Sequence, residues 1–231
     1  MNDIILYHGS RGGIDGPIAP TSRARCDFGK GFYMGQHEMQ AKGLVVDDSA
    51  PFFYKINLKL SEIPEKRILM LDEKDWLYTV LACRKKTTDF SNLPIAQIME
   101  KRLRNYDVII GPIADDRMNE AIQAFSSGLL SDVGLEHCLK HVGYGNQYVL
   151  KTDFACSKAE ILEEKSIGYY EAEEVREYNA KMRKAGRNAI QEAVRATSGQ
   201  GKYIYDIIRE AQGHVVNNSE IEDAINDLQY R

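Results

Sequence analysis

The chain has 231 residues, of which 43% are hydrophobic and 28% charged, and its formal net charge is −4. This size and composition predict a globular protein with one ordinary domain, or one domain with an appendage. They exclude a global basic field that attracts nucleic acid, though not a local basic patch, and the lack of an apolar run of about 18 residues excludes a membrane-spanning helix.

The N-terminus and the cysteines predict a cytoplasmic location. Asp3 lies in the first residues, and no basic region precedes Ile4, so we expect no signal peptide. The four cysteines, none at C-x-x-C spacing, are predicted to be reduced thiols rather than a zinc or redox motif. They are Cys26, Cys83, Cys138 and Cys156.

Short apolar runs separated by glycine and proline predict strands in the first part of the chain. Ile4–Tyr7 reads as a buried strand, and the glycine density of residues 9–31 predicts a long irregular loop. Loops of this length are often functional. Next we expect strands at 32–34, 52–60 and 68–71, a helix at 38–46 and a helix from Asp72 to Cys83.

The second part of the chain is predicted to be mostly helical. We expect helices over 94–105, from Asp115 or Asp116 to Phe125, and from Ser131 to Lys140, with strands at 107–111 and 147–151. Ser157 and Glu160 have capping-box spacing, which predicts a short helix.

From Tyr170 onward, apolar residues at helical spacing predict a helical extension, followed by helices at 203–211 and from Ser219. We therefore predict two parts, residues 1–165 and a helical C-terminal extension, residues 166–231. The extension is either a cover for one face of the first part or a partner-binding module.

Three glycine-containing segments and one glutamine carry candidate chemistry. In Tyr7-His8-Gly9-Ser10, the histidine ring can orient a ligand, and Gly9 permits a close approach to the backbone. Such a histidine alone is more often structural.

In Asp27-Phe-Gly-Lys-Gly-Phe-Tyr33, Lys30 lies between two glycines. Aromatic rings at Phe28, Phe32 and Tyr33 offer faces for stacking on a flat ring. The same residues are equally typical of a hydrophobic anchor that closes a loop.

Gly111-Pro-Ile-Ala-Asp-Asp-Arg117 places two acids and an arginine directly after an apolar strand, where sites gather. A helix cap with a surface ion pair is the commoner meaning. Gln147 lies at the start of a predicted strand, where a glutamine taken alone is usually a polar residue at the strand end with no functional role. His137 and His141 share a helix face, but no third ligand or H-E-x-x-H glutamate accompanies them, so we expect no metal site.

In this order the four segments resemble a bacterial family known as DUF3990, over roughly residues 4–162. That family is similar to a divergent branch of the ADP-ribosyltransferase superfamily. The resemblance implies an α+β fold with split antiparallel sheets around an NAD cleft, here followed by the helical extension.

The resemblance also implies roles for individual residues. His8 would hold the adenosine-side ribose or the nicotinamide amide, Tyr33 would stack on nicotinamide, and Gln147 would take the third catalytic position. Many relatives have glutamate there; glutamine accepts a hydrogen bond but is not a general base, so Asp115 or Asp116 would assist. The catalytic candidates are Gln147, Tyr33, His8 and Asp116. The NAD-binding candidates are Tyr7, His8, Gly9, Ser10, Phe28, Lys30, Tyr33, Asp115 and Arg117.

The expected function is NAD-dependent mono-ADP-ribosyl transfer to a protein or nucleic acid, with a toxin or defence role and a neutralising antitoxin as partner. Because the ribose carbon gains oxocarbenium character, the enzyme must fix NAD⁺ and exclude water. Arg11, Arg23, Arg25 or Lys30 would neutralise the pyrophosphate. The alternatives are NAD⁺ hydrolysis and an inactive binding module that keeps the cleft.

Overall fold

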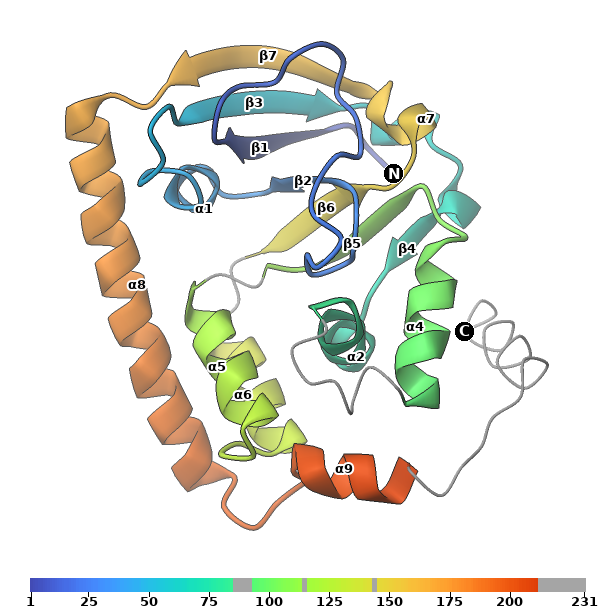
Figure 1. Cartoon of the computed structure of the whole chain (residues 1–231), viewed down its shortest axis with the longest axis vertical. Coiled ribbons are helices and arrows are strands. Elements are labelled where there is room, and N and C mark those ends of the chain that lie inside the picture. Colours follow the sequence, from blue (N-terminus) through green and yellow to red (C-terminus); the bar gives the residue numbers. More distant parts are fainter. Residues whose placement is uncertain (85–92, 114–115, 143–144, 212–231) are drawn as a thin grey trace.

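The computed structural model describes residues 1–84, 93–113, 116–142 and 145–211 and has an α+β fold (Figure 1). Its strands are β1 (Ile4–Ser10), β2 (Phe32–Gly35), β3 (Phe52–Leu58), β4 (Ile68–Met70), β5 (Val108–Pro112), β6 (Asn146–Leu150) and β7 (Ala159–Ser166). Its helices are α1 (Glu38–Gly43), α2 (Glu73–Arg84), α4 (Pro94–Leu103), α5 (Asp116–Ser126), α6 (Asp132–Val142), α7 (Asp153–Cys156), α8 (Tyr169–Ala196) and α9 (Ile204–Ala211). Two short 3-10 turns, η1 (Leu60–Glu62) and η2 (Glu65–Arg67), precede β4.

The strands form one seven-stranded sheet in the order β4-β5-β6-β2-β1-β3-β7. Only β4 and β5 run parallel; the other neighbours are antiparallel. The expected pair of separate sheets is therefore corrected to one mixed sheet. Strands β1 and β2 share the single residue pair Tyr7↔Gly35, whereas β1 and β3 pair from Ile4 to Ser10. The sheet is therefore weakly joined between β2 and β1, which separates β4-β5-β6-β2 from β1-β3-β7.

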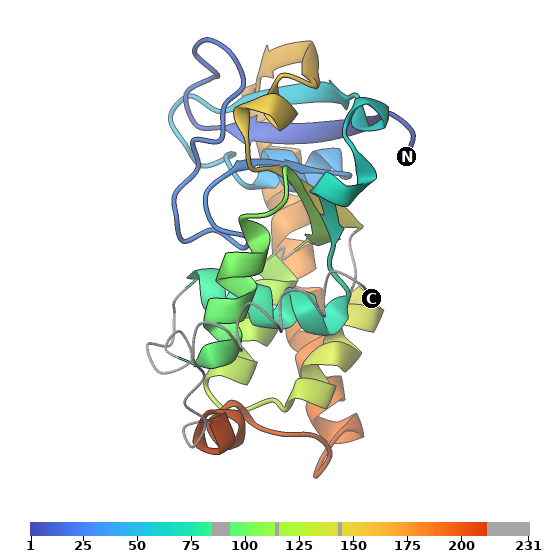
Figure 2. The ribbon, with the colours of Figure 1, turned by 90° about the vertical axis from the view of Figure 1, so that its right-hand side faces the viewer.

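Helices cover one face of the β5-β6-β2 part of the sheet, as the view turned by 90° shows (Figure 2). Apolar residues of α2, α4, α5 and α6 form a core around Trp76 and Phe125, both fully buried. The run Val108–Ile110 is buried throughout, as expected for a strand covered on both faces. The opposite face packs against the long loop and α7 through Leu6, Phe32 and their neighbours.

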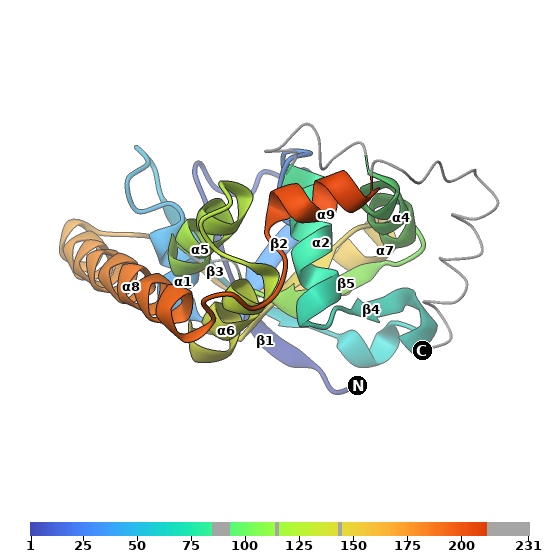
Figure 3. The same ribbon diagram turned by 90° about the horizontal axis from the view of Figure 1, so that it is seen from below.

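The C-terminal extension packs onto the rest of the chain. Helix α8 runs along the side of the molecule, past α1 at one end and past α5 and α6 (Figures 1 and 3). Its Val175 is fully buried in a cluster with α1, and its Ala193 and Ile204 of α9 belong to the core around Trp76. Residues after 165 therefore contribute to the cores of the preceding part. The helix expected from Ser219 lies outside the described residues.

The helix predicted from the capping box at Ser157 and Glu160 is wrong. Residues 159–166 form β7, which pairs with β3 along its length. The short helix is α7, one turn earlier, where the Thr152 hydroxyl accepts a hydrogen bond from the Ala155 amide at 3.2 Å. Pairing with β3 supplies backbone partners that outweigh a local cap. Within the described ranges, no helix is long and apolar enough to cross a membrane.

Candidate functional site

Tyr33 closes a turn in the loop that precedes β2. Its hydroxyl donates to the Gly29 carbonyl at 2.6 Å and accepts from the Phe28 amide at 2.9 Å. Gly29 has φ +73°, a conformation that glycine adopts without strain. Burial, with Asp27 nearby, raises the pKa of Tyr33, so the residue is a neutral phenol. The side chain packs on the helix-covered face of the sheet.

Gln147 lies on the same face, at the start of β6, and is 8% exposed. Its Nε2 donates to Asp27 Oδ2 at 2.9 Å and to the Pro112 carbonyl at 3.0 Å. Both partners are pure acceptors, so the amide has one workable orientation. Its two donors are thereby used, and within the described residues Oε1 accepts no hydrogen bond, so this atom is the group left for a ligand.

Asp27 and Arg84 form a largely buried ion pair beside Gln147. Arg84 of α2 donates from Nε to Asp27 Oδ1 at 2.7 Å, its Nη2 lies 2.6 Å from the same oxygen, and its Nη1 donates to Asn119. The side chains of Asp27 and Arg84 are 15% and 10% exposed. The loop between β1 and β2, drawn in blue in Figure 1, thus connects β6 to α2.

The acid beside Gln147 is a residue that the sequence analysis did not assign. Asp27 makes this contact; its place at the head of the Asp27–Tyr33 segment was the one available signal. Asp115 lies outside the described residues, and so do the side chains of Asp116 and Arg117.

His8 lies on the opposite face of the sheet from the side chains of Tyr33 and Gln147. Its ring packs 4.4 Å from that of Phe32, the neighbour of Tyr33 in β2, and successive strand residues point to opposite faces. Its Nδ1–H donates to the Tyr33 carbonyl at 2.7 Å. Burial lowers the pKa of His8, which favours the neutral ring with Nε2 as acceptor. The structure therefore joins His8 to the backbone of Tyr33, not to Gln147.

The neighbours of His8 serve the packing of β1. A Cβ atom at Gly9 would lie 2.2 Å from the Ala41 carbonyl oxygen, so the close approach that Gly9 permits is that of α1. The ring of Tyr7 stacks on that of Phe53 at 5.7 Å. The arrangement gives both residues structural contacts on the α1 side of the sheet.

Two other predicted NAD contacts also have internal partners. Phe28 is fully buried in the core around Trp76, so the expectation that its ring offers a face to a nucleotide is corrected: the ring is an anchor. The Ser10 hydroxyl donates to the Gly13 carbonyl at 2.7 Å, within the long loop. Arg11 lies 3.3 Å from Asp48, whereas Lys30 is exposed and lines a cavity described below.

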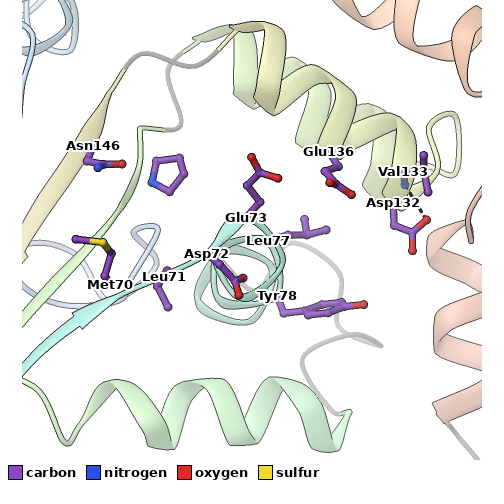
Figure 4. A pocket seen from close by; sticks show the side chains of 11 residues that line it. Met70, Leu71, Asp72, Glu73, Leu77, Tyr78, Asp132, Val133, Glu136 and Asn146 are labelled. Carbon is purple, nitrogen blue, oxygen red and sulfur yellow. Dashed lines mark hydrogen bonds between the residues drawn. The ribbon is translucent and has the colours of Figure 1, made fainter. Parts of the chain in front are cut away.

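A cavity of about 700 Å³ lies between α2, α6, the ends of β4 and β5 and the start of β6 (Figure 4). Pro112, whose carbonyl holds Gln147, lines it. Its carboxylates are Asp72, Glu73, Asp132 and Glu136. Asp72 accepts from the Asp75 amide, and Asp132 accepts from the amides of Val133 and Lys202, so two of them bond backbone groups. The described residues contain no cluster of metal-ligand side chains.

The model of the family described as "Protein of unknown function (DUF3990)" matches residues 4–161. The chain belongs to the DUF3990 family. The match covers β1 to the start of β7, with Tyr33, Gln147 and Asp27, and ends before α8. No curated protein and no solved structure matches this DUF3990 chain.

Proposed function

We propose that this DUF3990 protein is an NAD-dependent mono-ADP-ribosyltransferase that modifies a macromolecular acceptor, protein or nucleic acid, as a toxin or defence effector. The observation that carries the proposal is the Gln147 amide, held by Asp27 and Pro112 with its oxygen left as acceptor. Supporting it, the side chains of Tyr33 and Gln147 lie on one face of the adjacent strands β2 and β6, and the sheet is nearly divided between β2 and β1, whose His8 faces the other side.

The amide of Gln147 suits a ribose hydroxyl as its ligand better than it suits a charged ligand group. A buried amide oxygen is an acceptor for a hydroxyl, and a neutral group costs less to desolvate than a carboxylate. The hydroxyl groups of the nicotinamide ribose are suitable donors. Tyr33, a neutral phenol at the same face, holds the loop that carries Asp27.

Transfer breaks the bond between ribose and nicotinamide, whose electron pair leaves on the nicotinamide nitrogen, and the acceptor's nucleophile then bonds the same ribose carbon. The proton of that nucleophile needs a base, and Gln147 is not one. We assign this role to Asp27, the carboxylate in contact with Gln147. Arg84, whose Nη2 lies 2.6 Å from Asp27 Oδ1, holds this carboxylate in place beside Gln147.

The test is release of nicotinamide from NAD⁺ by the purified protein with cell lysate as the source of acceptor. Gln147→Ala is expected to lose at least about 100-fold in turnover, the scale of one directed hydrogen bond in a transition state. Gln123→Ala, an exposed glutamine on α5, is the matched control and keeps its turnover. Turnover that survives in folded Gln147→Ala would refute the site.

Labelled NAD⁺ separates the reactions. Label on a macromolecule supports transfer, whereas free ADP-ribose alone contradicts it and indicates hydrolysis. Asp27→Asn separates charge from position, because asparagine still accepts from Gln147 Nε2 through its amide oxygen. We expect this variant to bind NAD⁺ like the wild type and to transfer more slowly.

A further inference from the structure

A second cavity, of about 470 Å³, lies between the loop before β2, α4 and the end of β6. Four cationic side chains line it: Arg25 and Lys30 from the loop, Arg104 after α4, and Lys151 after β6. One carboxylate, Glu100, is also part of the lining. A chain with a net charge of −4 therefore gathers positive charge here, against its overall sign.

Lys151 is the least exposed of these cations. Its Nζ donates to the Phe28 carbonyl at 2.5 Å, and within the described residues it forms no ion pair with a carboxylate. An ammonium group has three donors, so this hydrogen bond leaves two to be satisfied. Burial lowers the pKa of Lys151, which means that the site disfavours its charge. An anion in the cavity would offset that cost.

The exposed cations point to the same kind of ligand. Arg25, Lys30 and Arg104 have no ion pair with another described residue. Arginine and lysine together are the side chains that bind phosphate oxygens. The cavity has the volume of a small-molecule site and an apolar wall that includes Leu103, so it has room for more than a bare ion.

We propose that this cavity binds the phosphate or pyrophosphate group of a nucleotide-sized ligand, with Lys151 and Arg104 as principal contacts. The site is distinct from that of Gln147, which opens β6, whereas Lys151 follows its last residue, roughly 13 Å away along the strand. The turn at Asp27 and Phe28 connects them, since Asp27 contacts Gln147 and the Phe28 carbonyl contacts Lys151. The site does not depend on the proposed transferase activity.

Calorimetric titration of the full chain with inorganic pyrophosphate tests the site. The wild type is expected to bind, and Lys151→Met and Arg104→Gln are each expected to weaken binding by about tenfold or more, the effect of one charge-assisted hydrogen bond. Arg195→Gln, an exposed arginine on α8, is the matched control and should bind like the wild type. Arg104 is exposed, so its variant is expected to fold even if Lys151→Met does not.

Repeating the titration in saturating NAD⁺ identifies the source of the phosphate. Competition assigns the cavity to the dinucleotide's own pyrophosphate, and independent binding assigns it to a separate phosphorylated ligand; both support the site. Absence of pyrophosphate binding by the wild type, or equal binding by Arg104→Gln, would overturn it. Failure of NAD⁺ to bind would instead count against the proposed function and leave this site standing.

Discussion

Replacing Gln147 with glutamate is expected to destabilise this protein. Gln147 Nε2 lies 2.9 Å from Asp27 Oδ2 and 3.0 Å from the Pro112 carbonyl oxygen. A carboxylate in its place has no hydrogen to donate and confronts two acceptors, one of them charged. Ionised, the pair repels by about 4 kcal/mol at an effective dielectric constant of about 20.

Protonation sets an upper limit to this cost. The introduced carboxyl group can donate to Asp27 once it takes a proton, and holding a group of pKa about 4.3 protonated at pH 7.5 costs about 4 kcal/mol. The same proton costs about 1 kcal/mol at pH 5. Because the folded-state pKa of the introduced carboxyl group would lie above its unfolded value, stability of Gln147→Glu rises as pH falls.

Urea unfolding of Gln147→Glu and wild type at pH 7.5 and pH 5 measures this difference. We expect a loss of about 4 kcal/mol at pH 7.5 that shrinks by about 3 kcal/mol at pH 5. Gln123→Glu, on the exposed face of α5, should change stability little at either pH. A Gln147→Glu protein as stable as the wild type at pH 7.5, or equally destabilised at both values, would refute the geometry assigned to the amide.

Two further predictions concern β1. Gly9→Ala brings a Cβ atom to 2.2 Å from a backbone oxygen of α1 and should lower the free energy of unfolding, measured by thermal denaturation, by about 3 kcal/mol. Gly12→Ala is the control, because a Cβ atom there meets nothing within 4 Å. Equal effects of the two substitutions would contradict this packing role of Gly9. Burial lowers the pKa of His8, so its contribution to stability is complete above about pH 6.5 and is lost as pH falls below that value. His8→Gln should therefore flatten the acid limb of urea unfolding between pH 7 and 5, and an unchanged limb would show that His8 protonates alike in both states.

Local patterns predicted most strands and helices because their causes are local. Apolar runs bounded by glycine gave β1, β2 and β5 within a few residues. The helix predicted from Ser131 is confirmed as α6, and the Ser131 hydroxyl, which accepts from the Gly134 amide at 3.1 Å, caps its start. The helix predicted from the capping box at Ser157 is wrong because the same segment pairs with β3, about 100 residues earlier in the chain. A local sequence pattern gives no information about so distant a strand partner.

The candidate site shows the same limit more sharply. Gln147 and Asp27 are 120 residues apart in sequence, and their contact depends on how the loop crosses the sheet. The sequence leaves Phe28 open between a stacking surface and a hydrophobic anchor, because the residue type of a loop aromatic does not indicate whether its ring is buried. Its ring is buried because Gly111 makes room: a Cβ atom there would lie 2.9 Å from Phe28 Cζ.

The contact between Phe28 and Gly111 explains why the three segments around Asp27, Gly111 and Gln147 belong together. The ring of Phe28 fills the space over Gly111. The side-chain amide of Gln147 donates hydrogen bonds to the carbonyl of Pro112, which follows Gly111, and to the carboxylate of Asp27. Each of the three segments thus holds another in position, through packing or through hydrogen bonds. Among the described residues, the Gln147 Oε1 atom is oriented by these contacts and accepts no hydrogen bond, so a ligand at this site should donate a hydrogen bond to it. The Tyr7–Ser10 segment belongs instead to the packing of β1 against α1, and its link to the site is the backbone of Tyr33.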